Sequence, residues 1–242
     1  MAVSDGESES GDSLDSFIEL AHLGERGSRA GLAGFVFAVL FVAAWLLLNE
    51  SPPFDAPAAD IIDYFGTSDE RRSSFLAGFY LLPLAGVAFI WYAGALRARI
   101  HRAGGLENRL LSTVQLMAGT LFVVAIILIG VIEVAVAWGA EAATDGAVDV
   151  ESARTMLALG AATGQIFVLR SGAVFIGVSA TRASRSGLFP DWFAFVSLAL
   201  AVGLLFVVTT WQPAVLIIPG WVVVTSVVVL AQRRNRLQPV EV

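Results

Sequence analysis

Six long apolar segments, separated by short polar stretches, dominate the sequence. A helix needs about 20 mostly apolar residues to cross the hydrocarbon core of a bilayer. The segments are close to that length, so the pattern predicts an all-α, polytopic membrane protein built as a bundle of six transmembrane helices. In chain order the predicted spans are residues 31–48, 72–96, 110–138, 153–181, 191–210 and 213–231.

The polar flanks divide the chain into three regions. Residues 1–30 form an acidic cytoplasmic tail rich in serine and glycine. Within it, apolar side chains recur at helical spacing and predict a short amphipathic helix from Leu14 to Leu23. Residues 31–232 hold all six spans, and residues 233–242 form a basic cytoplasmic tail. The spans leave no room for a second folded domain.

The segment between the first two spans has further structure of its own. We expect a short helix from Pro57 to Phe65, ended by Gly66. Thr67 and Glu70 form a T-x-x-E pattern, which predicts a capping box at the start of the second span. The apolar residues of the short helix, expected to face the bilayer or the bundle, are Ile61, Ile62 and Phe65.

Arginine supplies all the basic side chains of the chain, and its distribution predicts the orientation. Cytoplasmic loops of membrane proteins carry the excess of Lys and Arg. Three arginines flank spans on one side: Arg71, Arg72 and Arg154. Eleven lie on the other side: Arg26, Arg29, Arg97, Arg99, Arg102, Arg109, Arg182, Arg185, Arg233, Arg234 and Arg236. Both termini are therefore predicted to be cytoplasmic, with the protein in the cell membrane.

Composition excludes several kinds of chemistry. The absence of cysteine excludes disulfides, iron–sulfur clusters and cysteine zinc sites. The absence of lysine excludes a Walker A motif, and both histidines, His22 and His101, fall outside the predicted spans. A net charge of −6 argues against nucleic acid as a partner. We therefore predict no cofactor, no metal site and no catalytic residue.

Glu133 in the third predicted span and Arg170 in the fourth are the intramembrane charges that stand out. Such groups are costly in a bilayer and mark candidate sites. Gln115 shares the helical face of Glu133, and together with Gln165 it completes a candidate polar network. Arg170 is expected roughly 4 Å or roughly 16 Å deeper than Glu133, depending on which end of the fourth helix leaves the bilayer. The sequence leaves open whether the two charges pair.

Gly160 and Gly164 form a GxxxG pair on the fourth span. Small residues at this spacing let helix backbones approach closely in membranes. We therefore expect them at a helix-packing interface. Their periodicity does not distinguish packing within one chain from packing across a dimer.

Two short motifs carry a family resemblance. Residues 186–192 read Ser-Gly-Leu-Phe-Pro-Asp-Trp at the start of the fifth span, and 59–65 read Ala-Asp-Ile-Ile-Asp-Tyr-Phe ahead of Arg71 and Arg72. Both resemble bacterial six-span integral membrane proteins of unassigned function, over residues 30–232. The resemblance implies the six-span topology and carries no activity with it.

The functional expectation follows from the absence of catalytic, metal-binding and cofactor-binding motifs in the sequence. The leading hypothesis is a non-enzymatic structural or accessory component of the membrane, with the lipid bilayer as its surroundings and a second copy or a membrane protein as a candidate partner. The alternative is a transporter or channel for a small solute or ion that uses Glu133 and Arg170. A membrane-embedded enzyme is the third hypothesis.

Overall fold

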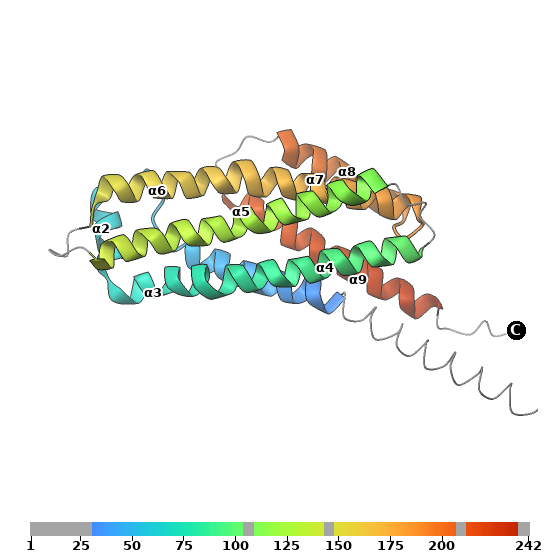
Figure 1. The fold of residues 1–242 in the computed structure, drawn as a ribbon, viewed down its shortest axis with the longest axis horizontal. Helices are drawn as coiled ribbons and strands as arrows, with labels where there is room; N and C mark the ends of the chain where they lie inside the picture. Colours follow the sequence, from blue (N-terminus) through green and yellow to red (C-terminus); the bar gives the residue numbers. More distant parts are fainter. Residues whose placement is uncertain (1–30, 104–108, 143–147, 207–211, 237–242) are drawn as a thin grey trace, which may run out of the picture.

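The computed structural model describes residues 31–103, 109–142, 148–206 and 212–236, and throughout these ranges the regular elements are helical (Figure 1). The acidic tail and its predicted amphipathic helix from Leu14 to Leu23 lie outside the described residues. The all-α fold class predicted from the sequence is confirmed for the described part of the chain.

The elements follow one another with short connections. The first is the N-terminal span, Gly31–Leu48. The next are α2 (Ala58–Gly66), α3 (Ser68–Leu76), η1 (Ala77–Leu81), α4 (Leu82–Arg102), α5 (Arg109–Ala142) and α6 (Val150–Thr163). The last are η2 (Gly164–Val168), α7 (Leu169–Arg185), α8 (Asp191–Phe206), η3 (Gln212–Leu216) and α9 (Ile217–Arg236). The segments η1 and η2 are π-helical turns inside longer continuous helices.

Among the described residues, five helices are long and apolar enough to cross a membrane, and each coincides with one of the predicted spans. These are Gly31–Leu48, Ser68–Arg102, Arg109–Ala142, Val150–Arg185 and Pro213–Leu230. The fifth predicted span, residues 191–210, begins with α8, but the 16 described residues of α8 are fewer than the roughly 20 that a full crossing needs. Figure 1 shows α2 at one end of the elongated bundle, with α8 and α9 toward the other.

The short helix after the first span forms as predicted, with a different buried face. Ile61 and Phe65 are fully buried, whereas Ile62 is 46% exposed. Tyr64 takes the third buried position because it lies three residues after Ile61, on the same helical face. These side chains pack against α5 and α6 and form a second core cluster at this end of the bundle.

The predicted capping box at the start of the second span is wrong. Thr67 does occupy the N-cap position of α3, but its side chain makes no capping hydrogen bond there. Its hydroxyl instead donates to the backbone carbonyl of Asp63 at 2.9 Å. The preceding helix ends one residue earlier, so its unpaired carbonyls compete for the hydroxyl.

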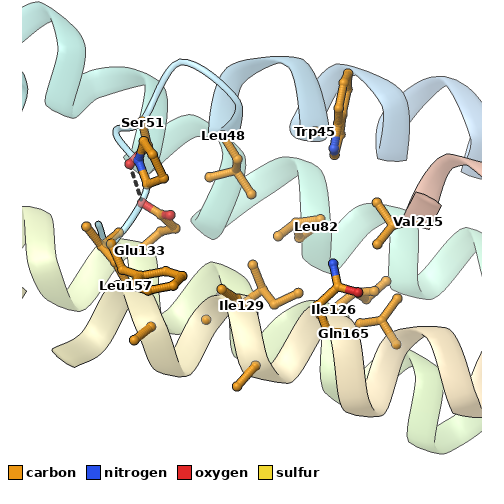
Figure 2. Close-up of a pocket in the computed structure, with 18 of the residues that line it drawn as sticks. Trp45, Leu48, Ser51, Leu82, Ile126, Ile129, Glu133, Leu157, Gln165 and Val215 are labelled. Atoms are coloured by element: carbon orange, nitrogen blue, oxygen red, sulfur yellow. Dashed lines mark hydrogen bonds between the residues drawn. The ribbon is translucent and has the colours of Figure 1, made fainter. Parts of the chain in front are cut away.

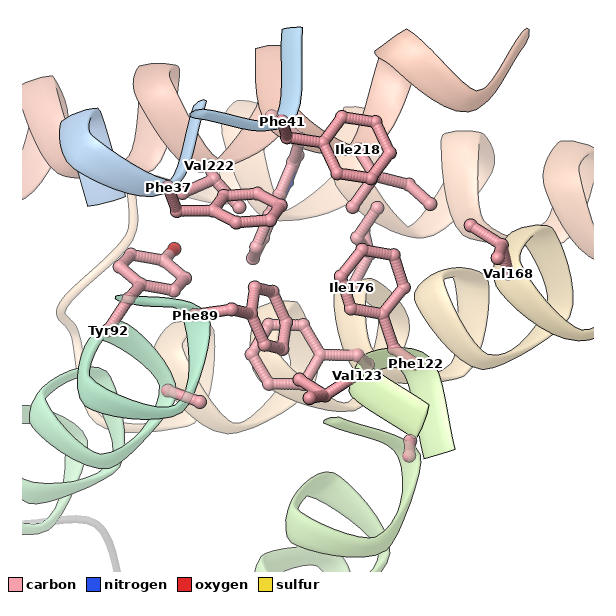
Figure 3. Packing of buried hydrophobic residues seen from close by; sticks show 14 of the residues in the cluster. Phe37, Phe41, Phe89, Tyr92, Phe122, Val123, Val168, Ile176, Ile218 and Val222 are labelled. Atoms are coloured by element: carbon pink, nitrogen blue, oxygen red, sulfur yellow. The ribbon is translucent and has the colours of Figure 1, made fainter. Parts of the chain in front are cut away.

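A cluster of phenylalanine rings fills the centre of the bundle (Figure 3). The ring of Phe89 lies 5.0 Å from Phe37, 4.6 Å from Phe122 and 5.0 Å from Phe175, measured between centroids. All four side chains are fully buried. They come from the N-terminal span, α4, α5 and α7, so this aromatic cluster joins four helices at one level.

The helical turn η1 and the helix α5 meet backbone to backbone at a pair of glycines. A Cβ on Gly78 would lie 2.6 Å from the carbonyl oxygen of Gly130, and a Cβ on Gly130 would lie 3.0 Å from the Cα of Gly78. The obstacle is backbone, which cannot rotate away as a side chain can. The contact of η1 with α5 therefore requires a residue without a side chain at both positions.

Substitution Gly78→Ala is expected to lower the free energy of unfolding by about 1–3 kcal/mol, because the methyl group overpacks a backbone contact. Thermal unfolding of the purified protein in detergent measures the change. Gly94→Ala on α4 is the matched control, since nothing lies within 4 Å of its added Cβ. An equal effect of the two substitutions would show that the glycine contact is not tight.

Candidate functional site

A cavity of about 370 Å³ lies between the N-terminal span and the helices α5, α6 and η2. The connection after the N-terminal span lines one end of it. Apolar side chains form most of the wall. The lining residues are Phe41, Trp45, Leu48, Ser51, Pro52, Pro53, Phe54, Leu82, Ile126, Ile129, Glu133, Leu157, Ala158, Gly160, Ala161, Ala162, Gly164, Gln165, Val168 and Val215.

Two of the sequence-predicted polar residues, Glu133 and Gln165, line this cavity. Ser51 donates a long hydrogen bond of 3.5 Å to a carboxylate oxygen of Glu133. The side-chain oxygen of Gln165 is buried, and no described residue donates to it. Figure 2 shows Glu133 beside Ser51 at one end of the view and Gln165 toward the other, with Leu48 and Ile129 between them. The cavity thus presents two hydrogen-bond acceptors with spare capacity.

The packing of α6 against α5 fixes the register of these residues. Added Cβ atoms on Gly160 and Gly164 would lie 3.5 Å from Ile132 and 3.7 Å from Ile129 respectively. The helices are antiparallel, so Gln165 lies near the level of residue 128, roughly 8 Å along the axis from Glu133. The glycines pack within the chain at ordinary van der Waals distance, and both also border the cavity. A Cβ would fit at either position, so this contact is looser than that of Gly78 with Gly130.

The same register separates Glu133 from Arg170. Arg170 lies about ten residues beyond the level of Glu133, which is roughly 15 Å and matches the larger separation allowed by the sequence. Its guanidinium donates to the backbone carbonyl of Gln165. In the π-helical turn η2 the amide of Leu169 bonds the carbonyl of Gly164, so the regular pattern of carbonyl acceptors is shifted there. Arg170 satisfies one of these carbonyls and stabilises the turn beside the cavity.

Gln115 belongs to a different polar group. Its amide nitrogen donates to the hydroxyl of Ser179 at 2.8 Å, and Arg182 donates to its side-chain oxygen. Gln115 and Arg182 are buried on facing helices, α5 and α7. The four-residue network predicted from the sequence is therefore divided between two places. Sequence reasoning missed Ser179 and Arg182, although their spacing of three residues puts them on one helical face.

Ser51 was also missed, and it belongs to a cap that covers one end of the cavity. This cap, residues 49–66, is tied down by arginines: Arg154 donates to the carbonyl of Ala56 at 2.7 Å, and Arg71 donates to that of Phe65 at 2.6 Å. Burial of Tyr64 against the bundle raises the pKa of its hydroxyl above the ordinary value. The cap is anchored by charged hydrogen bonds to backbone as well as by its apolar face.

Few polar groups line the cavity. Among the described residues no three His, Cys, Asp or Glu side chains come together in a way that could hold a metal ion. The cavity has one carboxylate, one amide and one hydroxyl in an apolar wall. Such a wall suits a small ligand with an apolar body and hydrogen-bond donors.

Comparisons with known proteins add no assignment. No protein-family model matches the chain, and neither a curated protein nor a solved structure gives a significant match to it.

Substitution Arg170→Gln is expected to lower the free energy of unfolding by about 1.5–3 kcal/mol, because a charged donor to the partly buried carbonyl of Gln165 is lost. Thermal unfolding in detergent measures this change. Arg185→Gln, at an exposed position of the same helix, is the control and should alter stability by less than about 0.5 kcal/mol. If both variants unfold at the same temperature as the parent protein, Arg170 does not stabilise the π-helical turn.

Proposed function

We propose that this chain is a non-enzymatic, multi-pass component of the cell membrane that holds a small molecule in its cavity. It crosses the bilayer six times with both termini in the cytoplasm, and residues 191–210 provide the fifth crossing. The asymmetry of arginine between the two sets of loops supports this orientation. The cap of residues 49–66 and the nearby end of the cavity then face outward.

Exposed apolar side chains support contact with lipid. Large apolar residues on outward faces of several helices are half or more exposed, which is unfavourable in water and expected in a bilayer. The most exposed of them include Phe195, Phe206, Trp91, Leu110, Val39 and Met117. Some of this surface is also available to a second copy or another membrane protein.

The observation that carries the proposal is that the cavity ends on the aromatic cluster. Phe41, Leu82 and Ile126 belong both to the cavity wall and to the packed core. Beyond them lie the fully buried rings of Phe37 and Phe122. A solute could cross to the other side only if these close-packed rings separated, and packed interiors resist such a change. The geometry therefore supports binding in a closed-ended site more than conduction.

Transport is the second candidate function. A π-helical turn borders the cavity, and such turns occur frequently at functional sites. A transporter of this kind would have to open the aromatic cluster during its cycle, so that the cavity is reached in turn from each side.

The six-span topology predicts a defined labelling pattern for single cysteines, since the parent chain contains none. Asp55→Cys and Thr144→Cys should react with an impermeant maleimide in intact cells. Ser13→Cys, Asn108→Cys and Val240→Cys should react only after the membrane is permeabilised. The cysteine-free parent gives the background. Reaction of Val240→Cys in intact cells would show that the C-terminus is outside, and it would contradict a sixth crossing.

A cysteine in the cavity wall tests whether the cavity is closed where it meets the aromatic cluster. Ala161→Cys should react with a small impermeant thiosulfonate in right-side-out vesicles and stay unreactive in inside-out vesicles. Ser186→Cys, in the predicted cytoplasmic loop after α7, should show the opposite pattern and controls for vesicle sidedness. Reaction of Ala161→Cys from both sides would contradict the closed-ended site and favour the transporter.

A further inference from the structure

We propose that the cavity binds a small cationic amphiphile, with a protonated amine at Glu133, a short apolar body along the wall and a second hydrogen-bond donor at Gln165. This ligand class rests on the binding function proposed above and gives it a chemical identity.

The first part of the inference comes from the carboxylate. Among the described residues, Ser51 is the donor to Glu133, and its bond of 3.5 Å is at the limit of a hydrogen bond. The guanidinium of Arg170 donates to the backbone carbonyl of Gln165, which lies roughly 8 Å from Glu133 along the bundle axis. A carboxylate in an apolar wall is costly unless a charge or several donors accompany it. An ammonium group of a ligand supplies both at once.

The second part comes from the amide at the other end. The side-chain oxygen of Gln165 is buried and receives no hydrogen bond from the described residues. A buried acceptor without a partner loses its hydration and gains nothing in return. A hydroxyl or amide N–H on the ligand would satisfy it. The axial separation of roughly 8 Å between Glu133 and Gln165 sets the distance between the two polar ends.

The third part comes from the wall and its size. Between the two acceptors the cavity is lined by apolar side chains, including Leu48 and Ile129 (Figure 2). A volume of about 370 Å³ is near the lower end of ligand pockets, which span about 300–1,000 Å³. The space suits a compact amine with a short chain and is too small for a whole phospholipid. A single acyl chain would fill the apolar part but leave both acceptors without donors.

Trp45 offers a direct readout because it lines the cavity at the end away from Glu133 (Figure 2). The purified full-length protein in detergent is titrated with ω-bromo-hexylamine, ω-bromo-hexanol and ω-bromo-hexanoate, whose bromine quenches indole fluorescence at short range. The variant Trp45→Phe supplies the signal of the other tryptophans for subtraction. The amine should quench Trp45 saturably and bind at least about tenfold more tightly than the alcohol, with no saturable quenching by the carboxylate.

Two substitutions assign the ends of the ligand. Glu133→Gln should weaken the amine at least about tenfold, whereas Glu141→Gln, exposed on the same helix, should leave it unchanged. In competition, ω-amino-hexanol should displace the brominated amine a few-fold better than hexylamine does, through its added donor. That advantage should disappear in Gln165→Leu, while hexylamine itself competes as before.

Equal quenching by the three probes, unchanged in Glu133→Gln, would overturn the proposal and indicate a non-selective apolar site such as one for an acyl chain. The absence of any Trp45-dependent quenching would overturn it as well. If size-exclusion chromatography shows that Glu133→Gln does not fold, the preference for amine over alcohol in the parent protein decides. Ala161→Leu, which fills the cavity, must then abolish the quenching.

Binding in detergent does not depend on the orientation of the chain in the membrane. A labelling pattern that contradicts the topology and a ligand that does not bind are therefore separate results.

Discussion

Polar atoms within a bilayer have no water to bind, and this constraint orders the polar side chains of the described spans. The π-helical turn η2 shifts its carbonyl acceptors, and the guanidinium of Arg170 reaches back to one of them. Gln115, Ser179 and Arg182 satisfy one another between α5 and α7. Tyr92 and Thr225 do the same between α4 and α9, at 2.5 Å. Each of these hydrogen bonds gives a polar group inside the spans a partner, and it also joins two elements.

The acceptors of the cavity are less well paired than these groups. Glu133 has one long bond from Ser51, and the side-chain oxygen of Gln165 has no donor among the described residues. Both open into the same apolar space. The incomplete satisfaction of two polar groups at one place, in a bundle that satisfies so many others, is the physical reason to regard the cavity as a binding site.

The cavity exists because the two halves of the bundle pack differently. At its centre the phenylalanine rings fill the space between four helices, and Gly78 and Gly130 bring η1 directly onto α5. Farther toward α2, Gly160 of α6 and Gly164 of η2 face isoleucine side chains, which would lie 3.5 and 3.7 Å from an added Cβ. Val215 of the short η3 completes this part of the cavity wall. Close packing on one side and small residues on the other leave a space that the cap covers.

The sequence by itself determined the environment and the lengths of most helices, because apolar runs of spanning length permit little besides membrane helices. It also singled out Glu133, Arg170, Gln115 and Gln165, since polar residues inside such runs are conspicuous. The tertiary structure alone decided which of them meet. The depth of Arg170 relative to Glu133 depends on the register of α6 against α5, and that register is set by side-chain contacts such as Gly160 with Ile132. Ser51 reaches Glu133 across 82 residues of sequence, a contact that helical periodicity cannot predict because it arises between separate elements.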